Sequence, residues 1–302
     1  MQINLRDALK TAQGASMALD RLDAQWLLLH ALGKTQSDRA WLLAHDDDLL
    51  AEPVLDAFRR LCERRASGEP LAYIVGYKAF FGLELAVDPR VLVPRPDTET
   101  LVQWSLDVLD DFYGQPSATA LAGVTKTETA APITPQILDL GTGSGALAIA
   151  IAHSLKQTGR AARIAAIDAS ADALKVAVGN AGRLKLNIEF STSQWLTQVS
   201  GRYHLIASNP PYIADADPHL KALRHEPLVA LTAGKDGLDD IREIVETAPE
   251  HLVSGGWLLL EHGHDQAAEV RQLLKLRGFE QVESRLDLAG IERCSGGRWP
   301  GV

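Results

Sequence analysis

The stretch Asp139-Leu140-Gly141-Thr142-Gly143-Ser144-Gly145 lies between a short apolar run, Ile137–Leu140, and an apolar segment of helical length, Ala146–Leu155. The three glycines of this loop let the backbone turn sharply and come close to a ligand. The helix behind the loop begins with N–H groups that have no partner within the helix. A strand, a glycine loop and a helix in this order predict a ligand-binding turn at the edge of a sheet.

Strand-like and helix-like segments alternate on either side of this turn and beyond it. We expect strands at Ile137–Leu140, Arg163–Asp168, Ile188–Phe190, Tyr203–Ser208, Trp257–Glu261 and Phe279–Leu286, and helices at Ala146–Leu155, Ala171–Leu184, Asp239–Leu252 and Ala267–Arg277. This alternation predicts an α/β fold with a doubly wound, mostly parallel sheet covered on both faces. Ligands bind such sheets beyond the carboxyl ends of the strands, so the functional residues are expected there.

The glycine loop fits two kinds of cofactor. With Ala146 it matches the GxGxxA fingerprint of dinucleotide sites. It also matches D-x-G-x-G-x-G, in which the glycines admit the adenosine and methionine parts of S-adenosylmethionine. Asp168, at the end of the next strand, is placed to accept both ribose hydroxyls of either cofactor. The alternative role for Asp168 is to cap the following helix together with Ser170.

The motif Asn209-Pro210-Pro211-Tyr212 follows the strand Tyr203–Ser208 directly. Consecutive prolines end strand pairing and fix the backbone. An amide or exocyclic amine nitrogen is a poor nucleophile, so two acceptors aimed at its N–H groups would hold its lone pair towards an incoming methyl group. The Asn209 side-chain oxygen and the Pro210 carbonyl are candidate acceptors, and Tyr212 offers a flat packing face. The motif favours methyl transfer over a nicotinamide reaction.

The first part of the chain has a different character. Residues 1–72 predict a helical domain, because apolar residues such as Leu22, Trp26 and Leu29 recur at helical spacing. Residues 73–95 are dense in strand formers and predict a β-hairpin linker, with the catalytic domain at 96–302. Residues 114–136 are rich in Ala, Thr, Pro and Ser and predict a flexible insertion.

Composition excludes several classes of protein. The chain has 302 residues and a formal net charge of -9, which argues against a large positively charged surface that binds nucleic acid. Its two cysteines, Cys62 and Cys294, lie far apart, so neither a disulfide framework nor a metal site is expected. The N-terminus has no signal-peptide pattern, and no apolar run approaches the roughly 20 residues of a membrane span. We expect a cytoplasmic monomer.

The glycine loop, Asp168 and the NPPY motif together resemble class I methyltransferases that act on planar nitrogens. More narrowly, the chain resembles the PrmC/HemK family of release factor glutamine methyltransferases over nearly its whole length. The most specific shared segments are Val93-Pro94-Arg95-Pro96-Asp97-Thr98-Glu99, Glu261-His262-Gly263 and Asp287-Leu288-Ala289-Gly290. The resemblance implies that S-adenosylmethionine is the methyl donor. It implies that the substrate is the glutamine of the Gly-Gly-Gln loop in bacterial peptide chain release factors.

The resemblance also implies site residues, carried over by position. The cofactor would be bound by Gly141, Thr142, Gly143, Ser144, Gly145, Asp168, Trp195 and Asn209. The substrate would be held by Asn209, Pro210, Pro211, Tyr212 and Arg95, with Asn209, Pro210 and Tyr212 as the catalytic residues. One position departs from the family pattern, because Gln194 stands where the family usually has Asp before the tryptophan. An amide can still accept from the adenine amino group, although without charge.

Two other functions are compatible with parts of this pattern. An adenine-N6 methyltransferase of nucleic acid can use the same NPPY chemistry, but the acidic charge and the lack of a basic, aromatic-rich region argue against DNA binding. A non-enzymatic cofactor-binding scaffold is disfavoured by an intact Asn209 and a complete glycine loop. The helical domain is expected to recognise the partner protein, and Glu261 is a candidate to support the site through hydrogen bonds.

Overall fold

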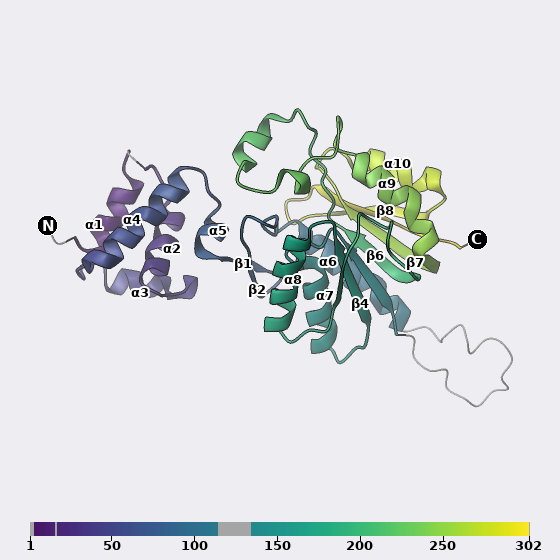
Figure 1. Cartoon of the computed structure of the whole chain (residues 1–302), viewed down its shortest axis with the longest axis horizontal. Helices are drawn as coiled ribbons and strands as arrows, with labels where there is room; N and C mark the ends of the chain where they lie inside the picture. Colours follow the sequence, from purple (N-terminus) through teal and green to yellow (C-terminus); the bar gives the residue numbers. More distant parts are fainter. Residues whose placement is uncertain (1–2, 16, 114–133, 302) are drawn as a thin grey trace. The chain divides into compact units, whose positions relative to one another are not determined.

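The computed structural model describes residues 3–15, 17–113 and 134–301, which form two compact units, Met1–Tyr77 and Lys78–Val302 (Figure 1). Most of the predicted insertion at 114–136 lies outside the described residues. Its expected end is wrong, because Gln136 is already the first residue of a strand. No helix in the described ranges is long and apolar enough to cross a membrane.

The unit Met1–Tyr77 is a helical bundle. Its helices are α1 (Leu5–Gln13), α2 (Arg21–Ala31), α3 (Arg39–Ala44), α4 (Glu52–Ala66) and α5 (Leu71–Val75), with a 3-10 turn at Gln36–Asp38. Leu27, Leu28 and Phe58 are buried in its core, where apolar burial stabilises the packing of α2 on α4. Tyr73 lies in α5 rather than in a strand, so the expectation of strand structure at this position is wrong.

A β-hairpin follows, formed by β1 (Tyr77–Phe80) and β2 (Leu83–Ala86). Its turn residues, Phe81 and Gly82, both have positive φ, as tight hairpin turns require. The hairpin side chains Leu83 and Leu85 are buried in the core of the second unit. Buried Asn180 fixes the strand edge, since its Oδ1 accepts from Ala86 N at 2.8 Å and its Nδ2 donates to Ala86 O at 3.0 Å.

The unit Lys78–Val302 is built on a seven-stranded sheet with the order β5-β4-β3-β6-β7-β9-β8. The strands are β3 (Gln136–Leu140), β4 (Arg163–Asp168), β5 (Glu189–Thr192), β6 (Tyr203–Ser208), β7 (Leu252–Glu261), β8 (Glu280–Leu286) and β9 (Glu292–Arg298). Strands β3 to β7 pair in parallel, and β9 pairs antiparallel with both β7 and β8. The prediction of a doubly wound, mostly parallel α/β sheet is confirmed.

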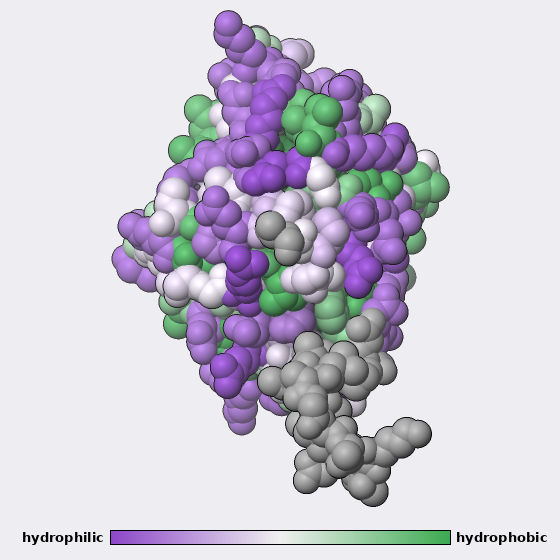
Figure 2. Space-filling model, turned by 90° about the vertical axis from the view of Figure 1, so that its right-hand side faces the viewer, coloured by the Kyte–Doolittle hydropathy of each residue, from purple (hydrophilic) through white to green (hydrophobic). Residues whose placement is uncertain are grey.

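Helices cover both faces of this sheet (Figure 1). They are α6 (Thr98–Tyr113), α7 (Ala146–Gln157), α8 (Ala171–Arg183), α9 (Asp239–Thr247) and α10 (Ala267–Arg277). Ile137 faces one core with α6 and α7, and the next residue, Leu138, faces the other with α9 and α10, as alternation along a strand requires. On the face shown in Figure 2, the apolar residues form small separate groups among polar ones.

Two expectations about the end of the sheet are wrong. The helix expected to run to Leu252 ends at Thr247, since a 3-10 turn at Ala248–His251 leads directly into β7. The strand expected to be the last one is also followed by a further strand, β9. Apolar and polar residues do not alternate along β9, because small residues are needed there. A Cβ at Gly296 would lie 2.5 Å from Leu259 Cδ2, so only glycine lets β9 pack at this point.

Candidate active site

The polar residues predicted from separate motifs meet at one edge of the sheet. Gly141 follows β3, Asp168 ends β4, Asn209 follows β6 and Glu261 ends β7, and these strands are neighbours with parallel direction. The chain runs outward from β3 through β4 to β5 and then returns to β6 on the other side of β3. The edge between β3 and β6 is therefore a topological switch point, where α/β proteins bind their ligands.

The three glycines of the loop have positive φ values of 66°, 54° and 84°, but they face different surroundings. A Cβ at Gly145 would lie 2.7 Å from Ile149 Cδ1, so this glycine permits close helix packing. A Cβ at Gly141 would lie 3.3 Å from the Trp195 ring. At Gly143 no atom lies within 4 Å of that position, which leaves open space above the loop. The loop is thus tightly packed at its two ends and accessible at its centre.

Two carboxylates, the buried Asp139 and the half-buried Asp168, hold the loop in place. Asp168 accepts from Gly143 N and from Ser170 N, each at 2.8 Å, and burial raises its pKa. Asp139 Oδ2 accepts from the Thr142 hydroxyl at 2.6 Å and from Ala148 N at 3.1 Å, and burial raises its pKa to about 7. A carboxylate has about four lone-pair sites, so Asp168 can accept further hydroxyl groups.

The helix-capping role considered for Asp168 is shared between two residues. The Ser170 side chain caps α8 by accepting from Ala173 N at 3.1 Å. Asp168 Oδ1 accepts a hydrogen bond from Ser170 N, just before α8 begins. Asp168 Oδ2 accepts a second one from Gly143 N in the glycine loop. Asp168 therefore joins the two loops that follow β3 and β4.

Trp195 forms a wall beside the glycine loop. It is buried, has a φ of 43°, and its Nε1 donates to Asp240 Oδ1 at 3.0 Å. Ser193 Oγ donates to the Trp195 carbonyl at 2.8 Å and helps to hold this uncommon backbone conformation. Gln194 is exposed beside it. Asp240 gives no recognisable signal in the sequence, because it lies 45 residues away from its partner.

On the other side of the switch point, the Asn209 amide has a defined orientation. Its Nδ2 donates to the buried Thr98 hydroxyl oxygen at 3.1 Å. None of the described residues donates a hydrogen bond to Asn209 Oδ1, which is therefore available as an acceptor. Asn209 lines a cavity of about 210 Å³. The lining residues are Leu92, Arg95, Asn209, Pro210, Pro211, Tyr212, Ile213, Leu223, Ala230 and Leu231.

Arg95 is brought to this cavity by Glu226, which the sequence did not reveal as a site residue. Arg95 Nη2 lies 2.6 Å from Glu226 Oε1, and Val93 N donates to Glu226 Oε2 at 3.1 Å. The Glu226 side chain is only 3% exposed, so its charge is shielded from water and depends on partners such as these. Farther along the same segment, Glu99 Oε1 accepts from Phe81 N at 2.9 Å and holds the hairpin turn.

Tyr212 is fixed at both ends. Its hydroxyl donates to Glu261 Oε1 at 3.3 Å, and its backbone carbonyl accepts from Gln266 Nε2 at 3.1 Å. A Cβ at Gly237 would lie 2.2 Å from the Tyr212 carbonyl oxygen, so only glycine fits against this turn. Burial and the neighbouring Glu261 raise the pKa of Tyr212, and the phenol stays protonated at neutral pH.

Glu261 is fully buried at the end of β7. Burial raises its pKa to about 7, and hydrogen bonds from Thr98 and Tyr212 oppose this shift. Its second oxygen, Oε2, is a buried atom that none of the described residues approaches as a hydrogen-bond donor, and a bare oxygen of this kind disfavours the ionised form. The positive charge of nearby Arg293 favours the ionised form of Glu261. The Nε atom of Arg293 lies 3.3 Å from Asp97 Oδ2 and 3.4 Å from Asp287 Oδ2.

Sequence comparison places the chain in a family. Residues 4–76 match the PrmC N-terminal domain, and residues 119–285 match the methyltransferase small domain. A release factor glutamine methyltransferase of Bordetella pertussis (strain Tohama I) is 44% identical over 287 residues, 94% of this chain and 96% of that protein. One of Burkholderia pseudomallei (strain K96243) is 45% identical over 293 residues, 94% of this chain and 93% of that protein. The chain belongs to the release factor glutamine methyltransferase family. This confirms the resemblance inferred from its motifs.

Solved structures agree with the methyltransferase fold. The catalytic domain of hMettl16, in complex with MAT2A 3′UTR hairpin 1, aligns with a TM-score of 0.53 and 15% identity. The alignment covers 78% of this chain and 80% of that one. At this level of identity the likeness concerns the fold alone.

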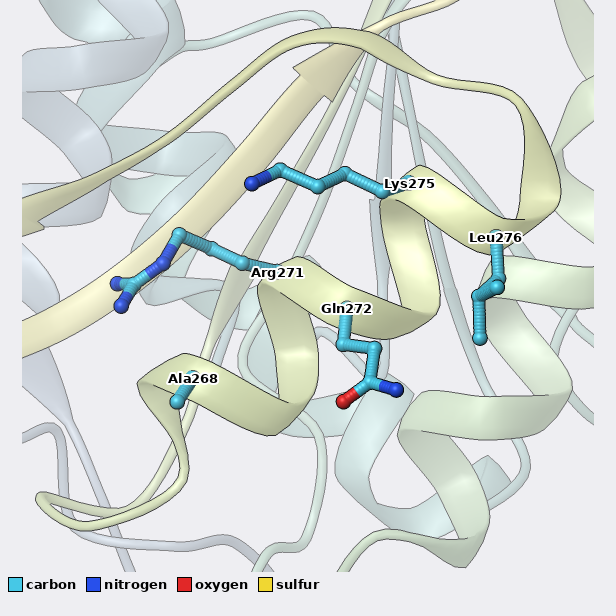
Figure 3. Close-up of a pocket in the computed structure, with 5 residues that line it drawn as sticks. All are labelled: Ala268, Arg271, Gln272, Lys275 and Leu276. Carbon is cyan, nitrogen blue, oxygen red and sulfur yellow. The ribbon is translucent and has the colours of Figure 1, made fainter.

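A second hollow in this methyltransferase, of about 370 Å³, has no features of a catalytic site (Figure 3). It is lined by Ala268, Arg271, Gln272, Lys275 and Leu276, which all belong to α10 (Figure 3). Side chains from a single helix do not converge on a ligand, and Arg271 is already paired with Glu292 at 2.6 Å. Among the described residues, no group of three or more His, Cys, Asp and Glu side chains could hold a metal ion.

Proposed function

We propose that this chain transfers a methyl group from S-adenosylmethionine to the side-chain amide nitrogen of the glutamine in the Gly-Gly-Gln loop of bacterial peptide chain release factors. The product is N5-methylglutamine. The observation that carries the proposal is the orientation of Asn209, whose Nδ2 is bonded to Thr98 while its Oδ1 remains available beside the cavity. The curated relatives named above carry the same activity in their names.

The cofactor side of the site suits S-adenosylmethionine. Open space lies above Gly143, and Asp168 beside it has lone pairs left for the ribose hydroxyls. Trp195, packed next to Gly141, supplies an apolar wall for the adenine. When bound, S-adenosylmethionine would supply an electrophilic methyl group.

The acceptor side suits a primary amide. Asn209 Oδ1 and the Pro210 carbonyl oxygen each accept one N–H of the glutamine amide and hold its plane. The nitrogen lone pair is perpendicular to this plane and therefore points towards the methyl group. The arrangement also stabilises the positive charge that develops on nitrogen, because both acceptors are in place before the reaction begins. Tyr212 and the two prolines pack against the flat amide, and Arg95 stands at the edge of the cavity.

The roles of the two units belong to the same proposal. The helical region 1–72 recognises the release factor, the hairpin region 73–95 links it to the site, and residues 96–302 carry out the transfer as a cytoplasmic monomer that does not bind DNA. A protein that lacks residues 1–72 is expected to bind S-adenosylmethionine normally and to lose affinity for the release factor. Unchanged affinity for the release factor would contradict this assignment.

The test of the activity is a transfer assay with labelled S-adenosylmethionine and a purified bacterial release factor. A second sample carries Gln→Ala in the Gly-Gly-Gln loop of the release factor. Label on the first factor and none on the second establishes the glutamine amide as the acceptor. If neither release factor is labelled although calorimetry shows cofactor binding, the proposal is overturned. Adenine-N6 methylation of nucleic acid then becomes the favoured function.

A further inference from the structure

Gln266, the residue before α10, contacts the end of the Asn209–Tyr212 turn. It is 9% exposed. Its Nε2 donates to the backbone carbonyls of Tyr212 and Asp236, each at 3.1 Å, and its Oε1 accepts from Gly263 N at 2.8 Å. Tyr212 and Asp236 lie 54 and 30 residues before Gln266, so these contacts exist only in the folded protein.

Only one orientation of the Gln266 amide satisfies all three partners. A backbone N–H can only donate and a carbonyl oxygen can only accept, so the amide oxygen faces Gly263 and the NH₂ faces the two carbonyls. The backbone also approaches the amide closely. A Cβ at Gly237 would lie 2.9 Å from Gln266 Nε2, and a Cβ at Gly263 would lie 2.9 Å from its Oε1. The amide is therefore held in a defined direction.

Gly263, the partner of the amide oxygen, is itself tied to the sheet. The fully buried His262 ring hydrogen-bonds to the Gly263 carbonyl through Nδ1 at 2.9 Å. The same ring hydrogen-bonds through Nε2 to Ser295 Oγ on β9 at 2.8 Å. Gln266 thus connects the Asn209–Tyr212 turn to the packed interior of the sheet.

The turn needs a contact of this kind because it has few donors of its own. Pro210 and Pro211 have no backbone N–H, so neither can fix the turn by donating a hydrogen bond. One end of the turn follows β6 directly, and the contact from Gln266 holds the other end at Tyr212. The Pro210 carbonyl between these ends has to keep a fixed direction if it is to accept from a substrate amide.

We propose that Gln266 is a positioning residue for methyl transfer. It holds the Tyr212 end of the turn against the loop at Asp236, and so fixes the direction in which the Pro210 carbonyl meets the substrate amide. The inference rests on the proposed function, because it concerns an acceptor that the turn offers to that amide. Gln266 is assigned no contact with the substrate or with S-adenosylmethionine.

The experiment compares Gln266→Met and wild-type protein in the release factor assay, with Gln272→Met as the control at an exposed glutamine of α10. Turnover is expressed per cofactor-binding site, counted by calorimetry, so that unfolded protein does not lower the apparent kcat. Met keeps the length of the side chain and removes its hydrogen bonds, so kcat should fall about 10-fold or more. The affinity for S-adenosylmethionine should stay unchanged, and Gln272→Met should keep wild-type kcat.

A second variant, Gln266→Glu, separates the two ends of the amide. Glu keeps an acceptor for Gly263 N but offers at most one hydrogen to the two carbonyls. Because the carbonyl contacts are the ones that hold the turn, Gln266→Glu should be at least as slow as Gln266→Met. A Glu variant with wild-type kcat would show that only the bond to Gly263 matters, and would overturn the inference.

A double-mutant cycle distinguishes positioning of the turn from general support of the fold. Asn209 Oδ1 and the Pro210 carbonyl hold one amide between them, so disturbing one changes the effect of disturbing the other. Gln266→Met should therefore lower kcat by less than about 3-fold in the Asn209→Ala background. An equal factor in both backgrounds, or wild-type kcat in Gln266→Met alone, would overturn the inference. Failure of the wild-type protein to label the release factor would instead count against the proposed function.

Discussion

The two sides of the switch point are built in different ways. On the cofactor side, the hydrogen bonds that shape the site span 3 residues of the chain between Asp139 and Thr142, 25 between Gly143 and Asp168, and 45 between Trp195 and Asp240. On the acceptor side, the contacts join distant segments, as between Thr98 and Asn209 or between Arg95 and Glu226. The cofactor side presents mainly backbone, and the acceptor side presents oriented side chains.

This difference reflects what each side has to do. A cofactor of constant shape can be held by a backbone turn that needs only glycines and one or two carboxylates. Stabilising charge on an amide nitrogen requires acceptors at defined positions, and each of them needs a further residue to hold it in place. Substitutions on the cofactor side should therefore abolish the binding of S-adenosylmethionine, whereas substitutions on the acceptor side should lower the rate of methyl transfer.

The largest effect is expected from Gly143→Val. The φ of Gly143 is 54°, a conformation that β-branched residues avoid, and a side chain there would fill the open space above the loop. Calorimetry should detect no binding of S-adenosylmethionine. Gly159→Val is the control, because Gly159 also has positive φ, of 67°, and open space around it, but lies outside the site. Normal affinity in Gly143→Val would contradict the placement of the cofactor.

An intermediate effect is expected from Asn209→Ala. Removing an acceptor that acts in the transition state should lower turnover by roughly 100-fold or more while cofactor affinity stays mostly intact. The exposed residue Asn187 provides the control, since Asn187→Ala should leave both quantities unchanged. If Asn209→Ala instead lost cofactor binding and kept its turnover at saturation, the division between the two sides would be wrong.

The smallest effect is expected from Glu226→Gln. The neutral amide retains one acceptor for Val93 N but loses the charge that holds Arg95, so the KM for the release factor should rise about 3- to 10-fold with kcat little changed. Asp88→Asn is the control, because the Asp88–Arg90 pair is exposed and such pairs contribute little. A fall in kcat without a change in KM would mean that Glu226 acts on the chemistry rather than on substrate binding.

Motifs with local causes were predictable from the sequence. The alternation of strands and helices predicted the parallel sheet, because each strand must be apolar on both covered faces. The glycine loop and the NPPY turn were recognisable because backbone conformation restricts which residues can occupy them. Strand β9 was missed for the opposite reason, since Gly296 is dictated by a neighbouring strand and carries no pattern of its own.

The sequence by itself determined the kind of sheet, the glycine loop at its edge, and the presence of Asn209 after a buried strand. Only the tertiary structure decided which way the Asn209 amide points, which carboxylate holds Arg95, and that Glu261 accepts from Tyr212. The physical reason is the range of the interactions. Backbone turns are set by neighbouring residues, whereas the direction of a hydrogen bond is set by partners that the fold brings together from distant parts of the chain.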